Sequence, residues 1–411
     1  MSLFNMPLIN MAFRQKFSNV KDLKENDNDN DMKKKMKMEM KATTKSNDSI
    51  SDPSKESSSN SLKDLPDNFS MPAEWTPHQS VWLAWPYDES IWLENLKPAQ
   101  EEFVAFCHAI VDLDPKTKQP RGETIDLMVF DEATKAKAQK ALHGLPINFH
   151  VFPYGDIWLR DTAPLFLKNQ SHQGRILRFE FNGWGEKYIM DHDDKVSQNI
   201  LQVVASQPGF GQWAQATQEK TDWICEGGSL EFDGLGTCLT TKQCLLNRNR
   251  NPNLSASQIE AKAKKSLGVN KILWLGDGLL NDHTDGHIDT VARFASPGVV
   301  LCMKASEQTD PNYQALNQIE MDLNQMKDGQ DRKLTVGLIP SPGKVLNSSG
   351  EIMPASYLNF YISNTKVIVP TYGSPYDQRA VAAIAKYFPD RQTLGLSAKA
   401  ILSGGGAFHC I

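Results

Sequence analysis

The chain has 411 residues, of which 40% are hydrophobic, and a formal net charge of -5 at neutral pH. This charge excludes a general attraction to nucleic acid, and the absence of any stretch of about 18 or more apolar residues excludes a predicted transmembrane helix. The six cysteines show no CxxC or other metal-binding spacing, which favours reduced thiols and a cytoplasmic protein.

Residues 1–65 differ in composition from the rest of the chain. An acidic run is followed by a basic one over residues 22–41, and residues 45–62 are rich in Ser, Asn and Lys. Such a segment cannot bury enough apolar surface to offset its ordering entropy. We therefore predict a disordered, low-complexity extension over 1–65 and a single domain over 66–411. Residues 1–19 contain basic residues and no acids, so a weak transit peptide or a short amphipathic anchor is the alternative there.

From Met71 onward, short apolar or alternating runs predict strands and helical spacing predicts helices. In chain order these are strand Val81–Trp85, helix 95–111, strand Thr124–Phe130, helix Glu132–Leu142, strands Asn148–Pro153, Arg175–Phe181, Ser229–Phe232, Thr237–Thr241 and Gln243–Asn247, helix Ser255–Leu267, strands Lys271–Leu275, Ile288–Phe294 and Val299–Met303, helix Asn312–Met326, strands Leu334–Ile339, Tyr357–Ser363 and Lys366–Pro370, helix Arg379–Phe388 and strand Thr393–Leu396. Asp233-Gly234 is a hairpin signal between two of these strands.

The order of these elements predicts an α/β protein that is not a doubly wound sheet. Short strands with one helix recur about five times, at intervals of roughly 50–70 residues, whereas in a doubly wound sheet a helix follows every strand. This rhythm suggests a radial repetition of small blades around a central axis. Loops from several blades would then bring Asp161, Glu226, His287 and Cys410 to one opening.

Cys410 is the first candidate for a catalytic residue. It follows Gly404-Gly405-Gly406 and adjoins His409, and glycines allow the backbone to approach a ligand closely. A nucleophilic cysteine requires an environment that favours the thiolate. The alternative is a buried structural cysteine, the usual fate of a free thiol.

The segment around His287 supplies candidate acid–base groups. Asp285, His287 and Asp289 share one face if this segment is extended, and so does His283. A histidine with a carboxylate is the arrangement of a general base. A zinc or iron site is the competing interpretation, although no cysteine pair supports it, and a solvated polar loop is the third.

Two further segments place acids beside aromatic residues or glycines. Trp158-Leu159-Arg160-Asp161 resembles a strand end with a surface ion pair, and Glu226-Gly227-Gly228 alone resembles a turn. Tryptophan rings near such acids can hold a cation against their faces, while most tryptophans are ordinary core residues. Neither segment alone predicts a function.

Together, these segments resemble the agmatine deiminase family of guanidine-modifying enzymes, which includes arginine and peptidylarginine deiminases, over about residues 65–411. The resemblance is carried by Met71-Pro72-Ala73-Glu74-Trp75 with Trp82-Leu83-Ala84-Trp85-Pro86, Asp156–Pro164, Glu226-Gly227-Gly228 with Leu239–Asn247 and Asn249-Arg250-Asn251-Pro252, Thr284–Asp289, and Gly404-Gly405-Gly406 before His409-Cys410. It implies a five-bladed pseudo-symmetric α/β propeller of the pentein type, in agreement with the rhythm of the elements.

The resemblance also implies roles for individual residues. Cys410 matches the nucleophile, His287 the general acid/base, Asp161 and Asp289 the carboxylates that grip the guanidinium, and Glu226 an acid that supports them. We add Trp158 and Asp285 as substrate-binding candidates, because they lie in the same motifs.

The implied reaction is hydrolysis of agmatine to N-carbamoylputrescine and ammonia through a covalent thiouronium. This reaction needs no metal or organic cofactor, no nucleic acid and no membrane. It is compatible with a homo-oligomer. Alternatives are an arginine or peptidylarginine deiminase, since Arg160, Arg178, Arg248 and Arg250 are available to bind a carboxylate, or a guanidinium-binding protein without turnover. A thiol protease would need an oxyanion hole and has no use for a cluster of acids.

Two departures from the family pattern lie beside Cys410. The family usually continues for several residues beyond the cysteine, whereas this sequence stops at Ile411, and Ala407-Phe408 stands where the family usually has Asn-Ile. We expect a terminus near the site to fray it or to add a negative charge.

Overall fold

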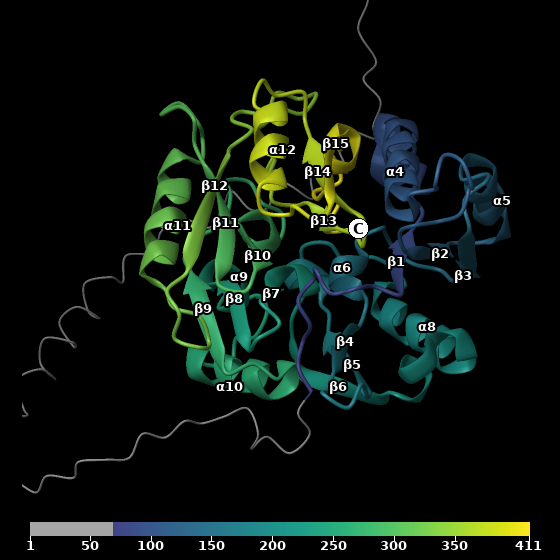
Figure 1. Cartoon of the computed structure of the whole chain (residues 1–411), viewed down its shortest axis with the longest axis horizontal. Helices are drawn as coiled ribbons and strands as arrows, with labels where there is room; N and C mark the ends of the chain where they lie inside the picture. The colour runs from purple at the N-terminus through teal and green to yellow at the C-terminus, as the bar shows by residue number, and fades with distance from the viewer. Residues whose placement is uncertain (1–68) are drawn as a thin grey trace, which may run out of the picture. The chain divides into compact units, whose positions relative to one another are not determined.

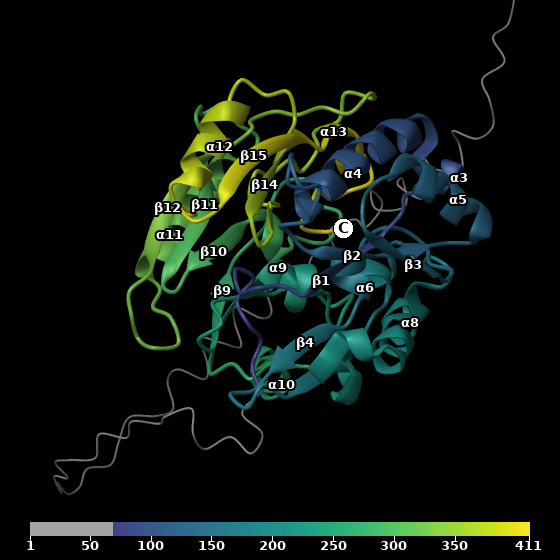
Figure 2. The same cartoon turned by 45° about the vertical axis from the view of Figure 1, so that its right-hand side comes forward.

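The computed structural model describes residues 69–411, whose strands form five three-stranded sheets. In every sheet, the strands lie in the order in which they occur along the chain. Figures 1 and 2 show these sheets with their covering helices. The predictions for the extension over 1–65 fall outside the described residues.

The first sheet is entirely parallel. It consists of β1 (Ser80–Ala84), β2 (Thr124–Val129) and β3 (Ile147–Val151). Helix α4 (Leu96–Val111) connects β1 to β2, and α5 (Glu132–Ala141) connects β2 to β3. Five of the six residues of β2 are buried, and because successive residues of a strand face opposite sides of the sheet, both of its faces are covered.

In each of the other four sheets, an antiparallel pair is followed by a third strand parallel to the second. The strands are β4 (Leu165–Lys168), β5 (Gly174–Glu180), β6 (Thr217–Ile224); β7 (Glu231–Phe232), β8 (Thr237–Thr241), β9 (Lys271–Leu275); β10 (Ala292–Ser296), β11 (Val299–Lys304), β12 (Thr335–Pro340); and β13 (Tyr361–Ile362), β14 (Lys366–Thr371), β15 (Gln392–Ser397). A parallel pair requires a crossover connection, which here contains α8 (Asp193–Ser206), α10 (Ala256–Leu267), α11 (Tyr313–Gln325) and α12 (Asp377–Ala385). The repeated unit is therefore a hairpin followed by a β–α–β crossover.

Short helices occupy the connections between these elements. They are α3 (Glu89–Trp92), η2 (Leu93–Asn95), α6 (Leu159–Thr162), α7 (Gly183–Glu186), η3 (Pro208–Gln215), η4 (Gly227–Ser229), α9 (Lys242–Leu245), η5 (Ile288–Thr290) and α13 (Lys399–Leu402). The predicted site residues lie in or beside α6, η4, η5 and the segment after α13.

Local signals explain the elements that sequence predicted well. Ser255 caps α10 in a capping box with Gln258, and Gly268 ends the helix with φ +64°. The Asp233-Gly234 hairpin is confirmed, because Asp233 accepts from the backbone N–H groups of the turn and Gly234 has φ +70°.

Three predicted strands need correction. Gln243–Asn247 is not a strand: the Thr241 hydroxyl accepts from Cys244 N at 3.2 Å and starts α9 there. The segment Ile288–Phe294 begins with the 3₁₀ turn η5 and becomes extended only at β10, while Tyr357–Ser363 forms the two residues of β13. In these short segments, side-chain caps and tertiary contacts outweigh apolar patterning. Strands β4 and β6 and helix α8 were not predicted.

The end of the described chain is anchored in the hydrophobic core. Phe408 is fully buried and stacks on Phe106 of α4, with ring centroids 4.7 Å apart and an interplanar angle of 4°. Helix α13 also packs against α4. The Ala407-Phe408 departure thus places a large aromatic ring in the core, directly before His409 and Cys410.

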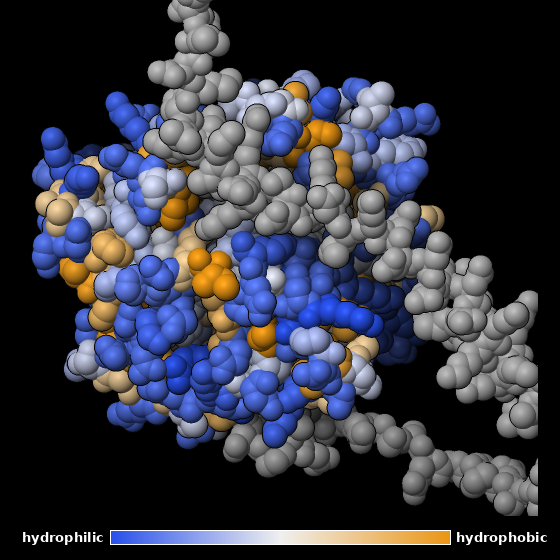
Figure 3. All heavy atoms as spheres, turned by 180° about the vertical axis from the view of Figure 1, so that it is seen from behind, coloured by the Kyte–Doolittle hydropathy of each residue, from blue (hydrophilic) through white to orange (hydrophobic). Residues whose placement is uncertain are grey.

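The described residues visible in Figure 3 present a mostly polar face. On the face in Figure 3, hydrophobic side chains form small separate groups in a largely hydrophilic surface. Among residues 69–411, no helix is both long and apolar enough to cross a membrane.

A buried carboxyl at the start of α8 predicts a pH effect on stability. Asp193 is 4% exposed and accepts from Gly155 N at 2.9 Å. Burial raises its pKa to about 7, and the nearby charge of Asp156 adds to this increase. Because the pKa of Asp193 is higher in the folded than in the unfolded state, protonation of this carboxyl favours folding. Its contribution to the free energy of unfolding is complete below the ordinary pKa near 4 and is lost as the pH rises through about 7.

We expect the free energy of unfolding to decrease by about 2–3 kcal/mol between pH 5 and pH 8 through Asp193, at 1.36 kcal/mol per pKa unit. An Asp193→Asn variant keeps an acceptor for Gly155 and cannot ionise, so its decrease should be smaller by this amount. Urea unfolding at four pH values measures both. Identical pH profiles for parent and variant would contradict the prediction.

Candidate active site

Asp161 is presented by the short helix α6 and oriented by two N–H donors. Its Oδ1 accepts from Gly228 N at 2.9 Å and its Oδ2 from Trp184 Nε1 at 2.8 Å. The side chain is buried, which raises the pKa of the carboxyl, while His287 acts in the opposite direction. The two donors hold the carboxylate in one orientation.

Glu226 precedes η4 and is fully buried. Its Oε1 accepts from Arg250 Nε at 2.9 Å, and its Oε2 lies 3.8 Å from His287 Nε2 and 3.9 Å from Cys244 Sγ. Burial acts to raise the pKa of Glu226, but His287 and Arg250 together lower it below its ordinary value. Glu226 is therefore an anion in the interior, compensated by neighbouring cations.

His287 lies between two carboxylates at the start of η5. Its Nδ1 is 3.7 Å from Asp161 Oδ1 and its Nε2 is 3.8 Å from Glu226 Oε2. Burial alone would lower its pKa, but the acidic groups around it, Asp161 first, raise the pKa well above the ordinary value. Neither ring nitrogen has a hydrogen-bond partner within the described residues, so both remain available to a bound group.

Asp289 is held by a histidine that is bound at both ring nitrogens. His409 Nδ1 lies 2.9 Å from Asp289 Oδ2, and His409 Nε2 lies 2.7 Å from Glu74 Oε1. With a carboxylate at each nitrogen, both nitrogens donate only when the ring is protonated. His409 lowers the pKa of Asp289 against the effect of burial, and Asp289 Oδ1 has no partner within the described chain.

Cys410 lies directly beside Asp289. Its Sγ accepts from Asn359 Nδ2 at 3.1 Å and is 3.4 Å from Asp289 Oδ2. Burial raises the pKa of the Cys410 thiol, and the charges of Asp289 and Asp161 raise it further. A cation placed between these carboxylates would favour the thiolate by opposing their charge.

Gly228 marks the point at which these groups converge. A Cβ atom added to Gly228 would lie 2.6 Å from His287 Nδ1, 2.8 Å from Asp161 Oδ1 and 3.2 Å from Asp289 Oδ2. Any side chain at this position would therefore occupy the space that the three polar groups share. The structure thus brings together Cys410, His287, Asp161, Glu226 and Asp289, which come from four separate segments of the sequence.

Trp158 shapes the glycine run that precedes Cys410. An added Cβ at Gly404 or Gly406 would lie 2.8 Å from the Trp158 ring, and one at Gly404 would also lie 2.8 Å from Trp92. The two indole N–H groups donate to the buried carboxylate of Asp156 at 3.0 and 2.8 Å. The glycines are thus required because indole rings pack directly against their backbone.

Asp285 takes a different position, behind Glu226. Its carboxylate accepts from Lys187 Nζ at 2.7 Å, from Asn249 Nδ2 at 3.0 Å and from Arg250 Nη1. These donors occupy both oxygens, and Arg250 connects Asp285 to Glu226. The structure does not bring Asp285 into the group around Gly228.

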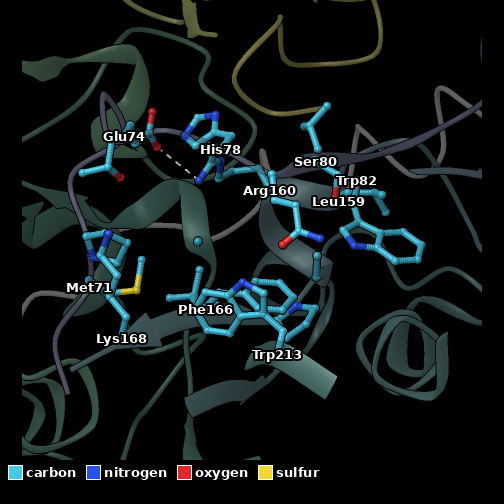
Figure 4. Close-up of a pocket in the computed structure, with 18 of the residues that line it drawn as sticks. Met71, Glu74, His78, Ser80, Trp82, Leu159, Arg160, Phe166, Lys168 and Trp213 are labelled. Carbon is cyan, nitrogen blue, oxygen red and sulfur yellow. Dashed lines mark ion pairs between the residues drawn. The ribbon is translucent and has the colours of Figure 1, made fainter. Parts of the chain in front are cut away.

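A cavity of about 630 Å³ lies beyond His409, lined by Glu74 and Arg160 and by aromatic side chains including Trp82 and Trp213. Figure 4 shows Glu74 and Arg160 pointing toward one another across part of it, 3.2 Å apart. None of the predicted catalytic residues lines this cavity. The converging polar groups around Gly228, rather than this cavity, therefore define the candidate site.

Comparison with known proteins identifies the family of this chain. A family model described as Porphyromonas-type peptidyl-arginine deiminase matches residues 70–411. The chain belongs to this family.

Relatives within the family are agmatine deiminases, which confirms the resemblance found in the sequence. The agmatine deiminase of Stutzerimonas stutzeri is 35% identical over 368 residues, covering 84% of this chain and 95% of the relative. That of Pseudomonas aeruginosa is 33% identical over 367 residues, with the same coverage. A solved structure of the Enterococcus faecalis agmatine deiminase superposes with a TM-score of 0.72 at 33% identity, covering 84% of this chain and 94% of that one. The fold is the α/β pentein fold of this family.

Several residues at the candidate site were not predicted from sequence. His409 adjoins the nucleophile candidate, and Glu74 lies in the quoted opening motif, but nothing local indicated that one would hold the other. Asn359 and Trp184 gave no signal, because each contacts the site from a segment without any recognised motif.

Proposed function

We propose that this chain is an agmatine deiminase, which hydrolyses the guanidinium of agmatine to N-carbamoylputrescine and ammonia. The observation that carries the proposal is the convergence of His287, Asp161 and Asp289 on the space above Gly228, with Cys410 Sγ 3.4 Å from Asp289. Relatives that bear the name agmatine deiminase support it at 33–35% identity.

In the first half of the reaction, the guanidinium lies between Asp161 and Asp289. Carboxylates match the planar, forked donors of a guanidinium, and its positive charge favours ionisation of Cys410. The thiolate attacks the central carbon and forms a C–S bond. His287 transfers a proton to the departing nitrogen, the C–N bond breaks, and ammonia leaves a thiouronium on the sulfur.

In the second half, His287 acts as a base. It removes a proton from a water molecule, whose oxygen adds to the thiouronium carbon. The C–S bond then breaks and returns the thiolate with a urea-type product. Glu226, 3.8 Å from Nε2, stabilises the protonated ring in both halves.

The arginines near the site already have partners in the protein, which favours agmatine over substrates that carry a carboxylate. Arg250 is bound to Glu226 and Asp285, and Arg160 donates to the His409 carbonyl at 3.1 Å and pairs with Glu74. Both are therefore committed to protein groups and are poorly placed to bind a carboxylate of free arginine.

A substrate panel of agmatine, free arginine and a peptidyl-arginine tests this proposal. Ammonia and the ureido product are measured, with Cys410→Ala as the blank. We expect the highest kcat/KM with agmatine. Preference for the peptide would assign a peptidylarginine deiminase, and binding of agmatine without ammonia release would assign a guanidinium-binding protein.

The shared space above Gly228 gives a separate prediction. In Gly228→Ala, the added methyl must displace His287 or Asp161, and a misplacement of about 1 Å costs on the order of a hundredfold in rate. We expect kcat/KM for agmatine to decrease about ten- to a hundredfold with little change in the thermal midpoint.

Gly209→Ala is the matched control, because an added Cβ at this exposed glycine meets nothing within 4 Å. It should retain parental activity. Parental activity in Gly228→Ala would show that the substrate does not occupy this space.

We also propose that the five sheets form the blades of a pseudo-symmetric propeller within a single domain over 66–411. The recurrence of a hairpin and a crossover helix in four of the five sheets supports this arrangement. A cytoplasmic location and a homo-oligomer remain predictions from sequence.

The N-terminal extension is predicted to be dispensable for the chemistry. Deleting Met1–Leu62 should leave kcat and KM within about twofold, because terminal segments of such composition tolerate removal. Steady-state kinetics of the deletion variant measures this. A large loss of activity in a folded variant would show that the extension contributes to the site or to assembly.

A further inference from the structure

A buried cysteine that the proposed reaction does not use lies beside the catalytic histidine. Cys244 Sγ is 3.9 Å from Glu226 Oε2, which is 3.8 Å from His287 Nε2. The three donor atoms lie within 4.8 Å of one another, and all three residues are buried. Thiolate, imidazole and carboxylate are together the ligands that zinc takes in proteins.

The separations of these atoms are close to those of a zinc site. Bond lengths of about 2.0–2.3 Å at tetrahedral angles place ligand atoms about 3.4–3.6 Å apart. The separations of 3.8 Å between His287 and Glu226 and of 3.9 Å between Cys244 and Glu226 require these side chains to close by a few tenths of an ångström, and the donor atoms of Cys244 and His287 lie within 4.8 Å.

Neighbouring groups hold Glu226 and Cys244 in place, and a carboxylate lies near the distal nitrogen of His287. His287 Nδ1 faces Asp161 at 3.7 Å, and a carboxylate at the distal nitrogen is the usual support of a metal-binding histidine. Arg250 holds the other oxygen of Glu226 at 2.9 Å, and the cap made by Thr241 fixes the turn that carries Cys244.

The buried His287 ring supplies independent evidence that a ligand belongs here. Its side chain is 1% exposed, and neither nitrogen has a hydrogen-bond partner in residues 69–411. Buried polar atoms of this kind normally have a partner. The other acidic cluster with a histidine, Glu74, Glu231 and His409, differs because Arg293 already binds both of its glutamates.

We propose that Glu226, Cys244 and His287 form an inhibitory site for Zn²⁺. Binding releases the Cys244 thiol proton, engages His287 through Nε2 and leaves the fourth position to water. The bound ion then prevents His287 from transferring protons, and its positive charge repels a cationic guanidinium. Inhibition rests on the proposed deiminase function, whereas zinc binding does not.

Zinc binding is tested on the full chain with Zn²⁺ and with Co²⁺ as a spectroscopic probe. We expect one equivalent of zinc per chain, measured by competition with a chromogenic chelator, and a thiolate-to-cobalt charge-transfer band. Cys244→Ser should weaken zinc binding at least tenfold. Cys225→Ser is the matched control: it is buried next to Glu226 but contacts Ser229, and it should bind zinc like the parent.

Cys410→Ala distinguishes the proposed site from zinc bound to the nucleophile, and it leaves Cys244 intact should Cys244→Ser fail to fold. Zinc binding and the charge-transfer band should persist in Cys410→Ala. Their loss in Cys410→Ala, or parental zinc affinity in Cys244→Ser, would overturn the proposal.

Activity is measured separately. If agmatine is hydrolysed, zinc should inhibit the parent and Cys225→Ser at concentrations at least tenfold lower than those that inhibit Cys244→Ser, each relative to its own zinc-free rate. Equal sensitivity of all three would overturn the inhibitory role. If agmatine is not hydrolysed, the proposed function fails, while the binding measurements still decide whether the zinc site exists.

Discussion

Cys410→Ala is expected to abolish ammonia release from agmatine while leaving agmatine binding in place. The variant removes the only thiol that lies within 3.4 Å of the clamping carboxylate Asp289 in the described chain. Without it, no C–S bond forms and the reaction loses its covalent step. Calorimetric binding combined with an ammonia assay separates the two effects.

The other five cysteines provide the controls. Cys107 and Cys302 lie in α4 and β11, and both are buried away from the groups around Gly228. Single alanine replacements at 107, 225, 238, 244 and 302 should each retain turnover. Normal turnover by Cys410→Ala, or loss of turnover in a folded Cys302→Ala, would refute Cys410 as the sole nucleophile.

Asp161→Asn and Asp289→Asn are expected to weaken agmatine binding and to reduce the rate further. Each substitution keeps the shape of the side chain and removes its charge. A charge-assisted hydrogen bond contributes roughly 1.5–3 kcal/mol, so Kd should rise about ten- to a hundredfold. The rate should decrease more than binding, because the guanidinium is no longer oriented for attack.

Two comparisons sharpen this test. His287→Ala should still bind agmatine but stall both the covalent step and its hydrolysis, because it removes the proton carrier and leaves both carboxylates. Asp222→Asn, which neutralises an exposed aspartate paired with Lys262, should bind agmatine like the parent. If both clamp variants bind agmatine as tightly as the parent, Asp161 and Asp289 do not hold the guanidinium and the proposed clamp is wrong.

The contact between His409 and Asp289 bears on how the clamp works. His409 is bound at 2.9 and 2.7 Å between Asp289 and Glu74, so an imidazole lies behind one of the two proposed clamping carboxylates. Asp161 instead has the neutral donors Gly228 N and Trp184 Nε1. The two carboxylates therefore share a role but differ in pKa, which is lowered for Asp289 and raised for Asp161.

Sequence determined the kinds of chemical groups in this protein and the order in which they occur. Local signals also sufficed for elements with clear caps or turns, such as the helix that starts after Ser255 and the hairpin at Asp233-Gly234. They failed at Gln243–Asn247, where an apolar run with strand character is a helical turn capped by Thr241. A window of a few residues does not reveal which backbone groups its side chains will bond.

Tertiary structure alone decided which of these groups meet. The motifs around Asp161, His287 and Cys410 were visible in the sequence, but their convergence on Gly228 depends on loops from different sheets. Asp285 and Asp289 are both aspartates of one motif, and the sequence does not distinguish their roles. In the structure, Asp285 is bound by Lys187 and Arg250, whereas one oxygen of Asp289 has no partner in the described chain. Sequence specifies residue type, whereas contacts between residues more than a hundred positions apart, such as that of Asp289 with Cys410, exist only once the sheets have packed.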